Sequence, residues 1–113
     1  MTMFNPPHPG EFIQETYLSP FNISQNEMAE KLEIAPSTFN RLIRGLHRVS
    51  PEMAIRLSKV LGRSPESWMA MQNLYDLGSL DPEDPEFSSL KRFDFGILNE
   101  RNERGGFNNL NNS

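Results

Sequence analysis

The side chains best suited to recognition chemistry in this 113-residue sequence lie near its middle, and they are hydrogen-bonding types. Arginine can bind guanine through two parallel hydrogen bonds, asparagine can pair likewise with adenine, and serine or threonine can reach base edges or a thymine methyl group. No acidic residue occurs from Ile34 to Pro51 to repel backbone phosphates. We therefore predict that Ser37, Thr38, Asn40 and Arg41 read bases and that Gln25, Arg44, His47 and Arg48 bind phosphates.

A pair of short helices must position these side chains. Ser24, followed three residues later by Glu27, forms a capping-box pattern that predicts a helix from Gln25 to about Leu32. Proline at the first helical position predicts a second helix from Pro36 to Arg44. The three residues between them give the spacing of a helix-turn-helix, with Glu33 standing where many such turns carry glycine.

Three further helices complete an all-α, five-helix expectation. Ser50-Pro51 and Ser64-Pro65 each join a capping serine to a proline suited to the first turn, and the two helices they open should end at Gly62 and Gly78. An earlier helix should run from Gly10 to about Leu18. The periodic apolar residues expected to face inward are Phe12, Ile13, Tyr17, Met28, Ala29, Leu32, Phe39, Leu42, Ile43, Met53, Ala54, Leu57, Val60, Leu61 and Trp68.

Charge is unevenly distributed along the chain. The net charge of −4 and the isoelectric point near 5.1 would by themselves argue against a nucleic-acid partner. Residues 1–80 carry seven basic and eight acidic residues, whereas residues 81–113 carry four and seven. Residues 41–63 contain six basic residues and a single acidic one, Glu52, so the sequence holds a local basic zone that suits DNA.

Several function classes are disfavoured by composition. The absence of cysteine excludes a disulfide scaffold and thiolate metal ligation. His8 and His47 are the only histidines and lack an acidic partner at a metal-ligand spacing. No nucleophile–base pair or phosphate-binding loop is present, and Asp94-Phe95-Gly96 stands without the other kinase motifs, so we expect no enzyme, metal or cofactor. No apolar run is long enough for a membrane helix and no secretory signal begins the chain, which predicts a cytoplasmic protein.

A change of character near Leu80 predicts two parts. Residues 1–80 should form the helix-turn-helix domain, and residues 81–113 an extension outside it. The extension opens with an acidic, proline-punctuated linker at Asp81–Glu86, which should not propagate a helix. Phe87–Leu98 holds six large apolar residues, which favours contact with a partner or a second copy, and the Asn-rich stretch Asn99–Ser113 is expected to be disordered.

Short segments between Asn5 and Leu80 form a combination more specific than a helix-turn-helix alone. They are His8-Pro9-Gly10-Glu11-Phe12-Ile13, Met28-Ala29-Glu30-Lys31-Leu32, Ala35-Pro36-Ser37-Thr38, Ser50-Pro51-Glu52-Met53-Ala54-Ile55-Arg56-Leu57, Ser67-Trp68-Met69 and Met71-Gln72-Asn73-Leu74-Tyr75-Asp76-Leu77. In these segments the chain resembles the HigA (VapI-like) antitoxins of the Xre, or lambda-repressor-like, group. His8 itself indicates a cap or packing residue rather than a ligand.

The resemblance implies a homodimer that binds a palindromic operator in double-stranded DNA, represses its own operon and neutralises a HigB-type ribonuclease toxin. It places Ser37, Thr38, Asn40 and Arg41 at the family's base-reading positions and the helix from Trp68 to Leu77 near its dimer interface. Two alternatives stay open. One is a free-standing Xre-type repressor without a toxin, and the other is a helical protein-interaction module that no longer binds DNA.

Overall fold

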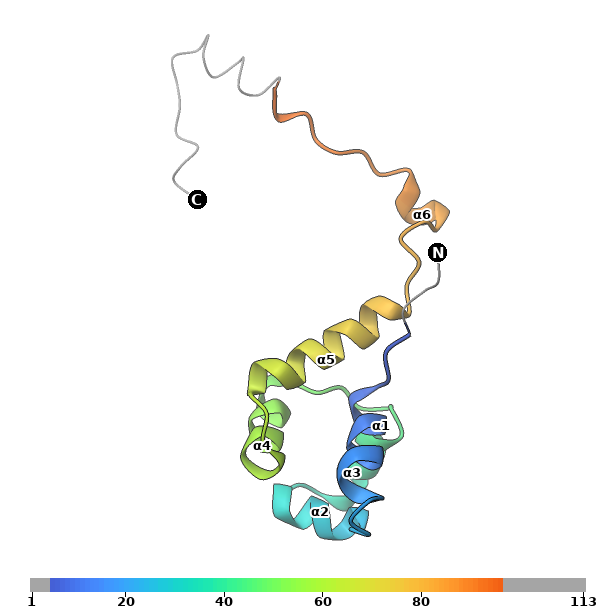
Figure 1. Ribbon diagram of the computed structural model, residues 1–113. Helices are drawn as coiled ribbons and strands as arrows, with labels where there is room; N and C mark the ends of the chain where they lie inside the picture. The colour runs from blue at the N-terminus through green and yellow to red at the C-terminus, as the bar shows by residue number, and fades with distance from the viewer. Residues whose placement is uncertain (1–4, 97–113) are drawn as a thin grey trace, which may run out of the picture. The chain divides into compact units, whose positions relative to one another are not determined.

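The computed structural model describes residues 5–96, and within them all regular secondary structure is helical (Figure 1). The chain divides into two compact units, Met1–Asp81 and Pro82–Ser113, and each is described by itself. None of the helices in the described part combines the length and apolar character needed to cross a bilayer. The expectation for Asn99–Ser113, and for the last two residues of Phe87–Leu98, lies outside the described residues.

Helix boundaries follow the local signals closely. The elements are α1 (Pro9–Ile13), the π-helical turn η1 (Gln14–Leu18), α2 (Gln25–Leu32), α3 (Pro36–Ile43), α4 (Pro51–Leu61), α5 (Pro65–Gly78) and α6 (Pro85–Ser88). The hydroxyls of Ser24, Ser50 and Ser64 accept the backbone N–H three residues on, at 3.0, 3.2 and 3.0 Å, and so cap α2, α4 and α5. The predicted all-α fold is confirmed.

One helix lies where the sequence predicted none. The single turn α6 begins at Pro85, inside the segment expected to be a non-helical linker. Proline ends a helix only when it stands in the interior, and here it takes the first position, where no N–H is needed. Asp84 completes the start, because its carboxylate accepts the N–H of Glu86 at 2.9 Å.

The predicted first helix, Gly10 to about Leu18, is helical throughout but changes type partway. In η1 the N–H of Ser19 donates to the carbonyl of Gln14, five residues back, at 2.9 Å. Five residues on an α-helix span about 500°, which would turn Leu18 about 140° away from Ile13. The wider turn keeps both side chains fully buried in the same core.

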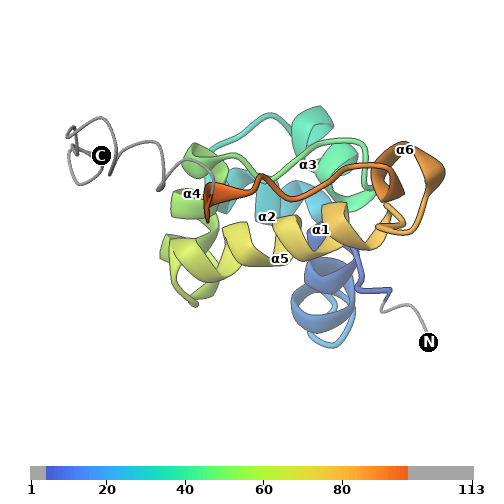
Figure 2. The ribbon, with the colours of Figure 1, turned by 90° about the horizontal axis from the view of Figure 1, so that it is seen from above.

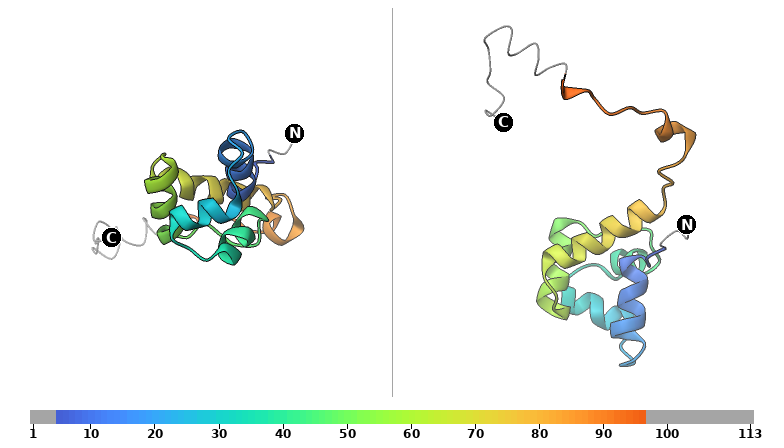
Figure 3. Two further views of the ribbon diagram at one scale, coloured as in Figure 1. Left: turned by 90° about the horizontal axis from the view of Figure 1, so that it is seen from below. Right: turned by 45° about the horizontal axis from the view of Figure 1, so that its top comes forward.

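The first unit encloses a single core. Helix α4 packs against α5, α2 against α3 and α4, and α1 against α3 and α5. Helix α5 runs across one side of this unit (Figure 2), and α2 lies on the opposite side (Figure 3, left). The buried apolar residues are Ile13, Leu18, Met28, Ala29, Leu32, Phe39, Leu42, Val49, Met53, Ala54, Leu57 and Trp68. Most of the residues predicted to face inward do so. The prediction for Val60 was wrong, since 38% of its surface is exposed.

Candidate nucleic-acid interface

The turn between α2 and α3 uses a left-handed residue. Glu33 has φ 58° and ψ 46°, a conformation that glycine adopts with less strain. The N–H of Ile34 donates to the carbonyl of Ala29, and the N–H of Glu33 to that of Glu30, both at 3.1 Å. These two bonds close the end of α2 in the manner of a Schellman motif, so the turn keeps its geometry although glutamate stands at the glycine position.

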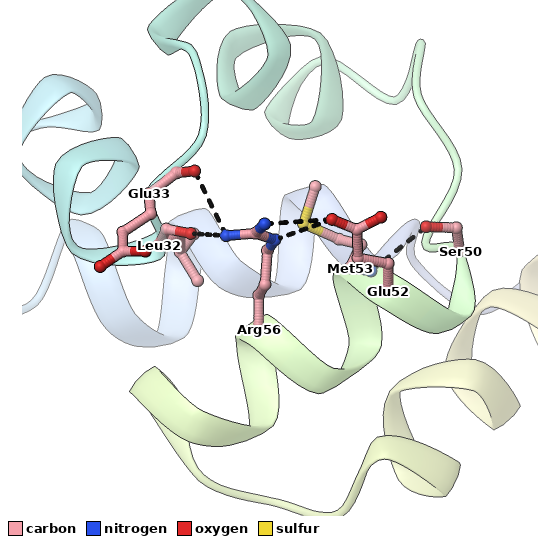
Figure 4. Close-up of polar contacts among 6 residues, drawn as sticks. All are labelled: Leu32, Glu33, Ser50, Glu52, Met53 and Arg56. Carbon is pink, nitrogen blue, oxygen red and sulfur yellow. Dashed lines mark hydrogen bonds and ion pairs between the residues drawn. The ribbon is translucent and has the colours of Figure 1, made fainter.

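Arg56 of α4 holds the same turn from the side (Figure 4). Its Nη1 donates to the carbonyls of Leu32 at 2.8 Å and Glu33 at 3.2 Å. On its other edge, Nη2 and Nε donate to Oε2 of Glu52 at 3.0 and 3.3 Å. Two backbone carbonyls at the end of α2 thereby accept hydrogen bonds from a charged donor. The positive charge also interacts favourably with the negative end of the helix dipole. The end of α2, and with it the turn that precedes α3, is anchored to α4.

The other end of α3 lies against α1. Gly10 packs so closely that a Cβ there would overlap the carbonyl oxygen of Leu42 and lie 2.8 Å from the Cα of Ile43. His8 caps α1, with Nδ1 accepting the N–H of Gly10 at 2.9 Å, which confirms the capping role expected for it. Burial lowers the pKa of His8, a fall that Asp76 partly opposes and Arg48 reinforces.

The four predicted base-reading residues fall into two groups. Ser37 and Arg41 are exposed on α3, whereas Thr38 and Asn40 are half-buried. Asn40 Nδ2 donates to Oε1 of Gln25 at 3.0 Å, so a predicted base reader and a predicted phosphate binder contact each other across the two helices. Pairing with adenine uses the oxygen and one of the two N–H donors of an asparagine amide, so Asn40 can keep its bond to Gln25 through the second N–H while it reads an adenine.

The predicted phosphate binders after α3 have different surroundings. Arg44 is exposed and has no ion-pair partner within residues 5–96. His47 is half-buried, and its Nδ1 donates to the carbonyl of Arg48 at 2.8 Å. Arg48 pairs through Nη1 with Oδ2 of Asp76 at 2.6 Å, while 65% of its side chain stays exposed. Arg48 can therefore meet a phosphate only with the donors that Asp76 leaves free.

Two residues of α5 fix this loop, and sequence reasoning did not assign them to the site. Gln72 is buried, accepts the N–H of Val49 at 2.9 Å and donates to Oδ1 of Asp76 at 3.0 Å. Desolvation acts to raise the pKa of Asp76, but hydrogen bonds from Arg48 and Gln72 hold it below its usual value. Two sequence signals pointed to them: their place in the Met71–Leu77 segment of the family resemblance, and their spacing, four residues apart on one helix face.

The cations of the basic zone, residues 41–63, are only partly free of other contacts in the folded chain. Three of the six cations contact other groups. Arg48 pairs with Asp76, and Arg56 binds Glu52 and two carbonyls. The Cζ of Arg63 lies 5.3 and 5.8 Å from the ring centroids of Phe12 and Trp68. Arg41 and Arg44 are the exposed cations that α3 and its end present. In the described part of the chain no three side chains of metal-binding type gather.

A short helix with exposed arginines, preceded by a tight turn, is the arrangement typical of a helix-turn-helix DNA-binding protein. Residues 16–68 match the helix-turn-helix family model. An Escherichia coli K12 protein described as an uncharacterized HTH-type transcriptional regulator, YddM, is 47% identical over 81 residues, which cover 72% of this chain and 85% of that protein. The chain belongs to the Xre-like helix-turn-helix family.

Solved structures support the same placement. A HigA-family addiction module antidote protein from Coxiella burnetii superimposes with a TM-score of 0.72 at 26% identity, covering 80% of this chain and all of that one. The antitoxin GraA in complex with its operator gives a TM-score of 0.73 at 31% identity, covering 83% of this chain and 97% of that one. Within its family the chain therefore belongs with the HigA (VapI-like) antitoxins. The family consists of DNA-binding regulators and antitoxins and is not an enzyme class.

Proposed function

We propose that this protein binds a palindromic operator as a homodimer in the cytoplasm, represses its own operon and neutralises a HigB-type toxin by direct binding. The observation that carries the DNA part is the exposed surface of α3. This helix exposes Ser37 and Arg41, and exposed Arg44 follows it. No acidic residue occurs in the chain from Ile34 to Pro51. The operator complex of the structurally similar GraA supports it. The toxin part rests on family membership.

Within this proposal the polar residues divide by task. Ser37, Thr38, Asn40 and Arg41 read base edges in the major groove, and Gln25, Arg44, His47 and Arg48 hold phosphates on either side. Asp76 engages Arg48 through one guanidinium nitrogen, so the side chain is ordered before DNA arrives. Ordering in advance lowers the entropy lost on binding, which is about 0.5–1.5 kcal/mol for a flexible side chain.

The dimer part is supported by apolar surface on α4 and α5. Leu74 and Leu77 are 49% and 68% exposed on α5, and Ile55 is 50% exposed on α4. A groove of about 390 Å³ between the two helices is lined by Pro51, Ala54, Ile55, Pro65, Glu66, Met69, Ala70 and Asn73. Apolar surface of this kind marks interaction sites. A two-fold dimer that binds a palindrome must hold its two recognition helices about 34 Å apart, one turn of DNA.

Fluorescence anisotropy with the DNA upstream of this protein's own gene, against a shuffled duplex at several salt concentrations, tests the DNA part. We expect Arg41→Ala to cost about 1–3 kcal/mol and to relax base preference. We expect Arg48→Ala to weaken binding to both duplexes alike. It should also lower the slope of log affinity against log salt concentration by about one. Lys59→Ala, at an exposed position of α4, is the matched control and should bind as wild type. Equal, weak binding of the wild type to both duplexes would refute operator recognition.

The toxin part has its own test. The gene next to this one should encode a small basic ribonuclease, and the two purified proteins should form a complex in which mRNA cleavage stops. A chain that ends at Leu80 separates the two proposed parts, because it should keep operator binding if residues 1–80 are the DNA-binding domain. Loss of toxin binding in that chain would assign the toxin contact to residues 81–113. A toxin that stays active with excess protein would end this proposal.

A free-standing repressor is the second candidate. The observation that favours it is the 47% identical relative, which is named a transcriptional regulator. The two candidates share the DNA chemistry and differ in partner. A gene neighbourhood with no ribonuclease, together with tight operator binding, would decide for the free-standing repressor.

A further inference from the structure

The His8-Pro9-Gly10 segment has no place in the proposed DNA face, yet it touches the end of α3. It also precedes residues 16–68, the span that matches the family model. A Cβ at Gly10 would overlap the carbonyl oxygen of Leu42. The same Cβ would lie 2.7 Å from the carbonyl carbon of Leu42 and 2.8 Å from the Cα of Ile43. All three are backbone atoms, so no side-chain rotation can make room. Helix α1 therefore approaches the backbone of α3 at a distance that only glycine permits.

His8 joins α1 to α5 at this approach. Its Nδ1 accepts the N–H of Gly10 and so orients the first turn of α1. Its ring meets Tyr75 of α5 edge-on, with 4.8 Å between ring centroids. Gly45, which follows α3 with φ 79°, would place a Cβ 3.7 Å from the same ring. One buried imidazole thus contacts α1 and α5, and it lies beside the open position of Gly45 just after α3.

We infer that Gly10 and His8 are positioning residues for operator reading, which set where the second half of α3 lies in the major groove. The inference rests on the proposed base reading by α3, since Arg41 directly precedes Leu42, and Arg44 directly follows Ile43. Specific base contacts need donor–acceptor distances within a few tenths of an ångström of about 2.9 Å. A displacement of about 1 Å removes such contacts, whereas flexible arginines still reach phosphates. Preference for the operator should therefore fall more than affinity for unrelated DNA.

The test compares two glycine substitutions in the full chain. Gly10→Ala pushes α1 and α3 apart. Gly62→Ala is the matched control, because Gly62 has φ 92° and strains an alanine, but a Cβ there meets nothing within 4 Å. Both should lower stability in urea unfolding. The readout is the ratio of the affinities for the operator and for a shuffled duplex, and we expect Gly10→Ala to lower that ratio at least tenfold and Gly62→Ala to leave it within twofold.

An unchanged ratio in folded Gly10→Ala overturns the inference, as does an equal fall in both variants. If Gly10→Ala does not fold, His8 decides. Asparagine is a strong N-cap residue whose oxygen can replace Nδ1, so His8→Asn should keep the ratio that His8→Ala loses. Equal ratios in those two variants also overturn the inference.

Amide spectra of the DNA-free protein separate this inference from the proposed function. In Gly10→Ala, the amides of residues 41–45 should shift, while those of α4 should not. If they shift and the wild type nevertheless prefers no operator, base reading is refuted, and with it the role of α1 in recognition. If the wild type does prefer its operator and these amides stay in place in Gly10→Ala, only the positioning role is refuted.

Discussion

Replacing Arg56 by methionine tests whether a single guanidinium from α4 stabilises the end of α2. Methionine keeps an unbranched apolar stem and nearly the same helix propensity, so Arg56→Met removes mainly the charge and its hydrogen bonds. The lost bonds are those to the carbonyls of Leu32 and Glu33, at 2.8 and 3.2 Å, and the pair with Glu52. The end of α2 would then depend on its own backbone bonds and on water.

The expected loss follows from these contacts. A hydrogen bond to a charged group contributes about 1.5–3 kcal/mol when buried. The Arg56 side chain is 33% exposed, so water can replace part of this, and the longer bond contributes little. The pair with Glu52, whose side chain is 76% exposed, adds at most about 0.5 kcal/mol. We therefore expect Arg56→Met to lower the free energy of unfolding by about 2 kcal/mol, and the melting temperature by about 8–16 °C.

Urea unfolding followed by circular dichroism measures this loss. Lys59→Met is the matched control, because Lys59 lies on the same helix, is exposed and has no ion-pair partner in the described structure. Glu52→Gln separates the two halves of the arrangement and should cost no more than about 0.5 kcal/mol. If Arg56→Met loses no more stability than Lys59→Met, the carbonyl contacts do not stabilise the turn. If its loss only equals that of Glu52→Gln, the ion pair accounts for all of it.

Three further outcomes are expected. Glu33→Gly should raise the free energy of unfolding by about 0.5–1 kcal/mol in the same urea assay, because glycine adopts the left-handed conformation without strain; a loss would show that the glutamate side chain stabilises the turn. Burial holds the pKa of His8 below 6.5, so just below pH 6.5 the imidazole is protonated in the unfolded chain but still neutral in the folded chain. Stability should be complete above pH 6.5 and fall as the pH drops from there through the folded pKa, and urea titrations from pH 8 to 5 should show a weaker dependence in His8→Asn. Leu77→Asp places a charge on the exposed face of α5, so sedimentation should show a folded monomer; an unchanged dimer would put the interface elsewhere.

The parts of the fold that sequence reasoning anticipated depend on neighbours within one turn of helix. Ser24, Ser50 and Ser64 cap the helices they were expected to cap, because a capping bond spans three residues. The apolar periodicity likewise placed Phe39 and Trp68 in the core. These features can be predicted because the information lies inside the segment that forms them.

The parts that could not be anticipated join residues far apart in the chain. Asn40 meets Gln25 fifteen positions away, and Arg48 meets Asp76 twenty-eight positions away. Neither contact follows from a local pattern, since the first depends on how α2 and α3 cross and the second on how the loop after α3 lies against α5. Arg56 was counted among the cations of a basic zone, although the fold uses it to bind carbonyls. The assignment of individual residues to bases and phosphates stays a prediction.

The π-helical turn η1 has a consequence for how this family can change length. A π turn holds about one residue more than an α turn, so Gln14–Leu18 contains the equivalent of a single insertion. Deleting one residue between Ile13 and Leu18 would bring them four apart, which is the spacing that an ordinary α-helix places on one face. Relatives that differ by one residue here can share the same core. The match to the helix-turn-helix family begins at residue 16, within this turn, so a gap placed there would mark a change in chain length that the fold absorbs.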